Sequence, residues 1–203
     1  METTVAQELI NRKKESGTYL APQLKLSPDL VRLRNEPSYA KSVNKLMRKY
    51  PTFNDFAIAN TPLRQFSLCQ DPEQCIYGDS PCLRLLDVTY GRFASAIWLV
   101  PQIADISVCC GLKEDASEAQ IKLVATAIAS KYKYLKTDEV MLFLFNFKAG
   151  FYERFYSYFD PQTIIKSMSS FLQERTNIIE EHDREMRRIK AEYEKNQLQL
   201  PKK

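Results

Sequence analysis

The sequence predicts an all-α protein, with a compact helical domain, a proline-interrupted N-terminal region and a long C-terminal helix. Only five of the 203 residues are glycine, which leaves few sites for the sharp turns of a many-stranded sheet. Helix-start signals recur at Ser117, Thr137 and Asp160. Neither glycine nor proline interrupts residues 162–200, so one helix of ~35 residues and ~50 Å is expected there.

The N-terminal region, residues 1–80, is expected to hold short helices because prolines interrupt it. A proline lacks the backbone N–H and clashes with the preceding turn, so it limits helix propagation. Ser27 is expected to cap a helix that has Pro28 at its first position. Ser38 is expected to cap the next helix, which should end before Tyr50-Pro51.

Residues 81–160 are expected to form an apolar and aromatic helical core, and residues 161–203 to contain the long C-terminal helix. Before the core, residues 60–80 show no periodicity and are predicted to be a loop. The sequence Ser117-Glu-Ala-Gln matches a capping box, in which the serine and glutamine side chains satisfy opposite backbone donors. The helices predicted in the core span residues 82–90, 93–110, 118–134 and 138–147.

Cysteine content and hydropathy favour a cytoplasmic protein. Residues 1–15 are polar and contain no apolar segment of a secretion signal. The five cysteines form an odd set without an export signal, which favours reduced thiols. Residues 93–112 carry a single charge, but Pro101 and Gln102 lie in their middle, and the stretch is marginal in length for a membrane span. We therefore expect no membrane association.

No catalytic, cofactor-binding or metal-binding residue is predicted, and the protein is not expected to be an enzyme. His182 is the only histidine, and no local nucleophile accompanies it for general-base catalysis. Cys69, Cys75 and Cys82 are separated by five and six residues, whereas zinc ligands usually come in pairs two to four residues apart. The chain also lacks the glycine-rich phosphate loops and hydrolase motifs of known enzymes.

Aromatic residues are dense between Phe143 and Phe159, where nine lie among seventeen residues. Four phenylalanines recur every four residues, which predicts one face of a helix, and Gly150 could bend or break it. These rings are too many to be buried around one helix, so some should reach the surface. Core packing, a protein interface and base stacking all remain open for them. The partner-binding candidates in this segment are Phe151, Tyr152, Tyr156 and Tyr158.

The C-terminal helix carries a heptad-like apolar stripe with one stutter near Ile178. Its distal candidates for binding a protein partner, or for forming a homo-oligomer, are Met186, Ile189 and Tyr193. A helix this long exceeds a compact domain, so its distal half is expected to project or to pair. Folding back onto its own domain is the alternative.

Positive charge is concentrated in the first quarter of the chain. Residues 1–50 hold ten basic and five acidic residues, while the net charge of the whole chain is +4. A basic arm is typical of proteins that bind nucleic acid, but no dense basic run exists here, so such binding should be weak and salt-sensitive. The candidate contacts are Arg12, Lys13, Lys14, Lys45, Arg48 and Lys49.

Three stretches of the sequence carry a family resemblance. They are Ser117-Glu-Ala-Gln-Ile-Lys continuing through Lys131-Tyr-Lys-Tyr-Leu-Lys-Thr-Asp-Glu-Val, Phe147-Lys-Ala-Gly-Phe-Tyr, and Phe155-Tyr-Ser-Tyr-Phe-Asp-Pro. Over about residues 82–184 the chain resembles uncharacterised small helical proteins of Bacteroidetes phages and mobile elements. In general pattern it is also similar to phage helicase loaders, which are helical and bind a replicative helicase. Neither resemblance transfers a functional residue.

Together these features predict a non-enzymatic adaptor or accessory protein of a mobile element or phage. A helicase-loader-like role in DNA replication is one form of that function. Two alternatives remain. One is a nucleic-acid-binding protein that uses the basic N-terminal region and the aromatic segment. The other is a structural oligomer built on the C-terminal helix.

Overall fold

The computed structural model describes residues 24–198, with side chains as far as residue 195, and this part of the chain is helical and contains no β-strand. The all-α prediction is confirmed. An isolated antiparallel bridge joins Cys82 to Lys136. The chain divides into two compact units, Met1–Ser167 and Met168–Lys203.

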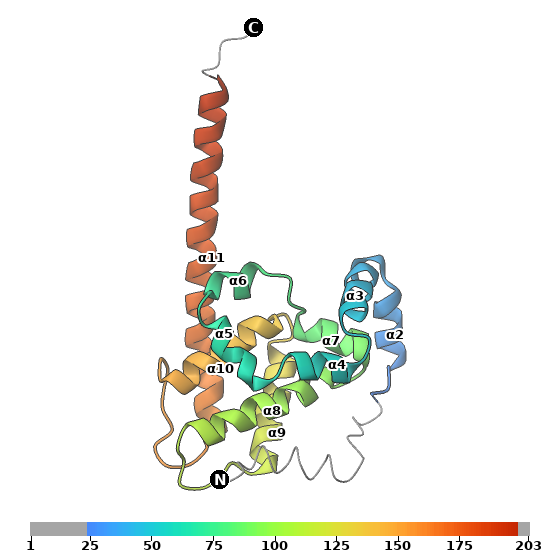
Figure 1. Ribbon diagram of the computed structural model, residues 1–203, viewed down its shortest axis with the longest axis vertical. Helices are drawn as coiled ribbons and strands as arrows, with labels where there is room; N and C mark the ends of the chain where they lie inside the picture. The colour runs from blue at the N-terminus through green and yellow to red at the C-terminus, as the bar shows by residue number, and fades with distance from the viewer. Residues whose placement is uncertain (1–23, 199–203) are drawn as a thin grey trace. The chain divides into compact units, whose positions relative to one another are not determined.

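Short helices build the first unit (Figure 1). In chain order they are α2 (Pro28–Asn35), α3 (Pro37–Lys49), α4 (Phe53–Ala59), η1 (Pro62–Arg64), α5 (Gln65–Leu68), α6 (Pro72–Tyr77), α7 (Leu83–Tyr90), α8 (Ala94–Cys109), α9 (Glu118–Lys131) and α10 (Thr137–Ala149). The final helix, α11 (Pro161–Leu198), begins in this unit and continues through the second.

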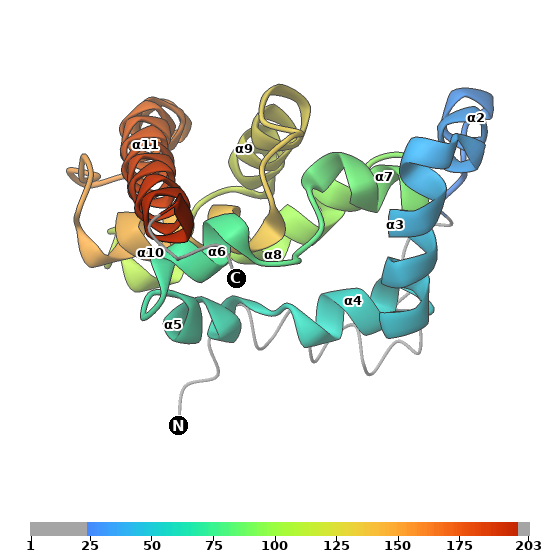
Figure 2. The ribbon, with the colours of Figure 1, turned by 90° about the horizontal axis from the view of Figure 1, so that it is seen from above.

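Helices α2, α3 and α7 pack together in the first unit (Figure 2). Ser27 caps α2 as predicted, because its Oγ accepts a hydrogen bond from the N–H of Leu30 at 3.4 Å. The prediction that Ser38 caps α3 is wrong. The helix begins at Pro37, with Glu36 at the N-cap. A proline has its φ angle already set for the first helical position, so the helix starts one residue before the serine.

Residues 60–80 are mostly helical, so the prediction of a loop is wrong. They contain η1, α5 and α6, which are three, four and six residues long. Asp71 caps α6 by accepting a hydrogen bond from the N–H of Gln74 at 2.8 Å. Helices of one turn or a little more are too short to show an amphipathic repeat, so periodicity could not reveal them.

One hydrophobic core joins the proline-interrupted residues to the later helices. Phe56 of α4 and Trp98 of α8 are both buried, with ring centroids 5.9 Å apart. Helix α8 packs against α9, and α10 packs against α5, α6 and α8. Residues 24–80 and 81–160 therefore belong to the same unit rather than to separate bodies.

The later helices start and stop largely where capping chemistry predicts. Ser117 and Gln120 form the predicted capping box of α9, with the Ser117 N–H donating to Gln120 Oε1 at 2.9 Å. Helix α10 includes Thr137, which was predicted to cap it. The N-cap is Lys136 instead, and its N–H donates to Glu139 Oε2 at 2.7 Å. Half a capping box thus replaces the threonine cap.

Helix α11 is a single helix of 38 residues, as its sequence predicted (Figure 1). Asp160 precedes it and accepts hydrogen bonds from the N–H of Gln162 at 2.9 Å and from Thr163 Oγ1 at 2.7 Å. These bonds satisfy donors that the first turn leaves unpaired, and they lower the pKa of Asp160. Among the described helices, none combines the length and the apolar character needed to cross a bilayer.

Candidate interaction surfaces

The distal part of α11 is exposed throughout. Every residue from 183 to 195 is exposed, including the apolar Met186, Ile189 and Tyr193, with exposed fractions of 52%, 48% and 64%. Spacings of three and four residues put these three side chains on one face of the helix. We call this set the distal stripe. It corresponds to the apolar stripe that the sequence predicted.

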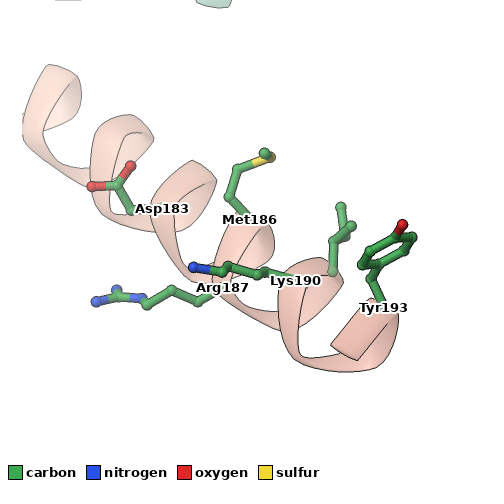
Figure 3. A pocket seen from close by; sticks show the side chains of 6 residues that line it. Asp183, Met186, Arg187, Lys190 and Tyr193 are labelled. Atoms are coloured by element: carbon green, nitrogen blue, oxygen red, sulfur yellow. The ribbon is translucent and has the colours of Figure 1, made fainter. Parts of the chain in front are cut away.

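Charged side chains border the distal stripe. A shallow hollow over this helix face is lined by Asp183, Met186, Arg187, Ile189, Lys190 and Tyr193. Figure 3 shows Met186 and Tyr193 extending from one side of the helix, while the long chains of Arg187 and Lys190 run across it in another direction. An apolar ridge with charged edges suits the face of a second helix better than it suits a small ligand.

Burial along α11 falls from its start to its end. Met168 and Phe171 are buried, Ile178 and Ile179 are half-buried, and the residues of the distal stripe are exposed. His182 is half-buried, and its Nδ1 lies 3.8 Å from Asp183 Oδ1. The histidine therefore occupies a position on the helix face next to an acidic neighbour, which fits the interpretation of a residue in the seam of the stripe.

The aromatic segment is divided at Gly150. Helix α10 ends at Ala149, and Gly150 adopts a left-handed conformation with φ of 83°. The N–H of Phe151 then donates to the carbonyl of Asn146 at 3.1 Å, as in a glycine-terminated helix end. Of the two outcomes that the sequence left open at Gly150, a bend or a break, the structure shows the break. The four-residue phenylalanine repeat therefore shares one helix face only as far as Phe147.

Three of the four predicted aromatic contacts are on the surface. Phe151, Tyr156 and Tyr158 have exposed fractions of 73%, 102% and 59%, and we call this set the aromatic loop. Tyr152, the fourth, is half-buried. Its ring stacks on the buried Phe143, with centroids 5.6 Å apart and an interplanar angle of 30°. A stacked ring pair of this kind fixes the start of the loop against α10 without further helix.

Lysine 148 is not available to a nucleic acid. Its Nζ lies 2.5 Å from Asp105 Oδ2 and 5.1 Å from the centroid of the Phe66 ring, and its side chain is almost fully buried. A buried, paired cation holds α10 to α8 instead of binding phosphate. The aromatic loop itself carries one exposed acidic and one exposed basic residue, Glu153 and Arg154, so its charge favours no polyanion.

The predicted basic contacts are only in part described. Arg12, Lys13 and Lys14 lie outside the described residues. Lys45, Arg48 and Lys49 are exposed on α3. Lys45 forms an ion pair with Asp79 at 2.9 Å, which lowers the pKa of that carboxyl group. This pairing neutralises part of the positive charge on the exposed face of α3.

Three of the five thiols are poorly suited to nucleophilic chemistry. Burial raises the pKa of Cys75 to about 12, with Asp138 and Asp71 adding to the shift. Burial also raises the pKa values of Cys109 and Cys110. A protonated thiol is a weak nucleophile and a weak metal ligand. Within the described residues, no group of three or more histidine, cysteine or acidic side chains is placed to hold a metal ion.

A buried polar network was missed by the sequence analysis. Arg64 donates two hydrogen bonds to Asp138, at 2.8 and 3.1 Å, and also contacts the Asn60 side chain. The Asn60 carbonyl in turn accepts hydrogen bonds from Trp98 Nε1 at 3.0 Å and from Gln102 Nε2 at 2.8 Å. These bonds join η1 and the end of α4 to α8 and α10. Their partners are far apart in sequence, so no local pattern indicates them.

Comparison with known proteins gives one match. Residues 116–197 match a family of unknown function (DUF6633). This match covers less than half of the chain. It includes the aromatic loop and the distal stripe, whereas the basic residues of α3 lie outside it. No curated protein and no solved structure is detectably similar to the chain.

Proposed function

We propose that the protein is a non-enzymatic adaptor that binds other proteins through two separate surfaces. One surface is the distal stripe in the second unit, and the other is the aromatic loop in the first. The observation that carries the proposal is the exposure of Met186, Ile189 and Tyr193 on one face of a helix. Burying apolar area in a complex is favourable by ~25 cal/mol per Å².

The aromatic loop supports the same function by its composition. Tyrosine and phenylalanine are enriched at protein interfaces and among the residues that dominate binding energy. Phe151, Tyr156 and Tyr158 are exposed, and the neighbouring rings of Phe155 and Phe159 pack at a centroid distance of 5.2 Å. A loop whose conformation is already fixed by packed rings loses less conformational entropy on binding than a flexible loop does.

The biological setting is proposed from the resemblance to phage and mobile-element proteins. We place the adaptor in such an element, with a helicase-loader-like role in DNA replication as the leading form. A reducing cytoplasm as its compartment is supported by the five cysteines, none of which is in a disulfide. A replicative helicase is then the first partner to test on the aromatic loop.

A capture experiment tests the adaptor function. The full chain would be compared with Met186→Glu/Ile189→Glu and with Phe151→Ser/Tyr156→Ser, using lysate of the native host and mass spectrometry. Each double variant should lose what its own surface binds, whether a different protein or a native copy of the same chain, and keep what the other surface binds. Lys195→Glu, an exposed charge change, serves as the matched control. Recovery of every protein by both double variants would contradict the proposal.

A second candidate function is weak binding of a polyanion by α3. The favouring observation is an exposed ridge of Lys41, Lys45, Arg48 and Lys49 on one helix. Arg48→Glu/Lys49→Glu should weaken binding to duplex DNA and make it less steeply dependent on salt. Deleting residues 1–50 is a poor test, because Val43 and Leu46 of α3 are buried in the core. Equal DNA binding by the double variant would remove this candidate.

A further inference from the structure

We infer that the distal stripe pairs with the same stripe of a second copy of the chain, in a parallel two-stranded coiled coil. The inference rests on the proposed function, since it names the occupant of one of its two surfaces. It is carried by the placement of charges beside the stripe. Those charges distinguish the two orientations in which identical helices can pair.

The apolar positions define a heptad frame, conventionally lettered a to g, for residues 179–195. Ile179, Met186 and Tyr193 fall at successive a positions, seven residues apart, and His182 and Ile189 fall at d. An a/d seam of this kind buries its side chains only against a second helix. The seam is short and includes a histidine, so pairing is expected to be of moderate affinity.

The residues at the edges of the seam favour a parallel pair. Asp183 and Lys190 occupy e positions, while Glu185 and Glu192 occupy g positions. In a parallel dimer, each g residue faces the e residue of the next heptad on the partner helix. Glu185 of each copy would therefore face Lys190 of the other, which gives two symmetric attractive pairs. Both side chains are exposed, and the pairs that they form within one helix, Glu185 with Arg188 and Lys190 with Glu194, would be exchanged for pairs between copies.

An antiparallel pair would bring like charges together. In that orientation, g positions face g positions and e positions face e positions. With Met186 of one copy opposite Ile189 of the other, Glu185 would face Glu192, while Asp183 would face Lys190. Two repulsive pairs would then offset two attractive pairs. The parallel arrangement has no such conflict, and it is the one we assign.

A parallel dimer would make the adaptor bivalent. Two copies of the aromatic loop would be carried by one dimer, and a second binding event on a multimeric partner becomes intramolecular. Such avidity can exceed the affinity of either loop alone without any new contact. The distal stripe would thus act by joining copies, and the aromatic loop by contacting a different protein.

Charge reversal at the seam edge tests the orientation. Sedimentation velocity of the full wild-type chain over a micromolar concentration range should show a monomer–dimer equilibrium. Glu185→Lys should weaken the dimer about tenfold, because two attractive pairs become two like-charge pairs. Lys190→Glu should weaken it similarly. An equimolar mixture of the two variants should recover dimer formation, since a parallel heterodimer again faces lysine with glutamate at both edges.

The matched control is Glu181→Lys, the same charge change at an exposed c position on the outer face of the seam. It should leave the dissociation constant within about twofold of the wild type. In the antiparallel register, Glu185→Lys would face Glu192 and strengthen pairing. Strengthened or unchanged pairing in this variant, or failure of the mixture to recover, overturns the parallel arrangement. A monomeric wild type would show that a second copy does not bind the distal stripe. The adaptor function is tested separately, by the capture experiment.

Discussion

Helix α10 and the distal part of α11 are both continuous helices, but different forces hold them. Nine of the 13 residues of α10 are buried, including charged Asp138 and Glu139 at its start. In contrast, every residue from 183 to 195 of α11 is exposed. Helix α10 is stabilised by tertiary packing, whereas the described contacts of distal α11 are local ion pairs within the helix.

The exposed ion pairs of distal α11 stabilise the helix only weakly. Arg188 lies 2.8 Å from Glu185, and Lys190 lies 4.0 Å from Glu194. Pairs three or four residues apart stabilise an isolated helix by about 0.2–0.5 kcal/mol each. Most helical stability in proteins comes instead from the packing of an apolar face. Distal α11 lacks such packing within the described residues, so pairing of its stripe would stabilise this part of the helix.

The largest effect is expected from removing a ring in α10. Phe143→Ala deletes a fully buried side chain that contacts Phe147 and Tyr152. Large-to-small changes of this kind cost about 3–5 kcal/mol of unfolding free energy, because apolar burial is lost and a cavity remains. Urea unfolding followed by circular dichroism measures this loss. Tyr156→Ala, at a fully exposed ring, is the control, and an equal loss there would contradict the division into core and surface rings.

A smaller loss of unfolding free energy is expected from breaking the ion pair that holds α10 to η1. Arg64→Ala leaves the nearly buried Asp138 carboxylate without its bidentate partner. The expected cost is about 1–3 kcal/mol, below that of a fully buried pair because Arg64 is partly exposed. The double variant Arg64→Met/Asp138→Asn should be more stable than Arg64→Ala, since no unpaired charge remains. If the double variant is the less stable one, Asp138 does not depend on Arg64.

Substitutions in the distal stripe are expected to change pairing between copies and to leave the stability of the first unit almost unchanged. Met186→Glu/Ile189→Glu should change the unfolding free energy of the first unit by less than about 0.5 kcal/mol, as for most surface substitutions. The double variant should no longer form the proposed dimer. The helical circular-dichroism signal should fall slightly, because the distal helix no longer packs against a second helix. A large fall in the unfolding midpoint of the first unit would show that the stripe is part of that unit's core.

The sequence predicted what depends on neighbouring residues. The Ser27 and Ser117 caps, the end of α7 at Tyr90 and the length of α11 all follow from chemistry within a few positions. The distal stripe was found for the same reason, because its period is local. A local prediction failed where two neighbouring residues both favour a helix start. Pro37 begins α3, so Ser38 lies inside the helix and does not cap it.

Tertiary contacts explain the remaining differences. Tyr152 was expected on the surface but stacks on Phe143 once Gly150 turns the chain back. The interaction of Arg64 with Asp138 joins residues 74 positions apart. Nothing near either residue in the sequence distinguishes a buried partner from an exposed one. The aromatic loop could therefore be predicted as a segment, but not the division of its rings between core and surface.

The smallest effect is expected at the exposed ion pair between Lys45 and Asp79. Its two side chains are 67% and 90% exposed, so water and salt screen their attraction and ordering them costs entropy. Lys45→Ala should leave the unfolding midpoint unchanged within error, at low and at high salt, even though its 2.9 Å distance is close to those of the Arg64–Asp138 pair. The matched comparison is Arg64→Ala, measured in the same urea titration. Equal losses for the two variants would mean that burial does not decide which ion pairs stabilise this protein, and the contrast between α10 and the exposed helix surfaces would lose its physical basis.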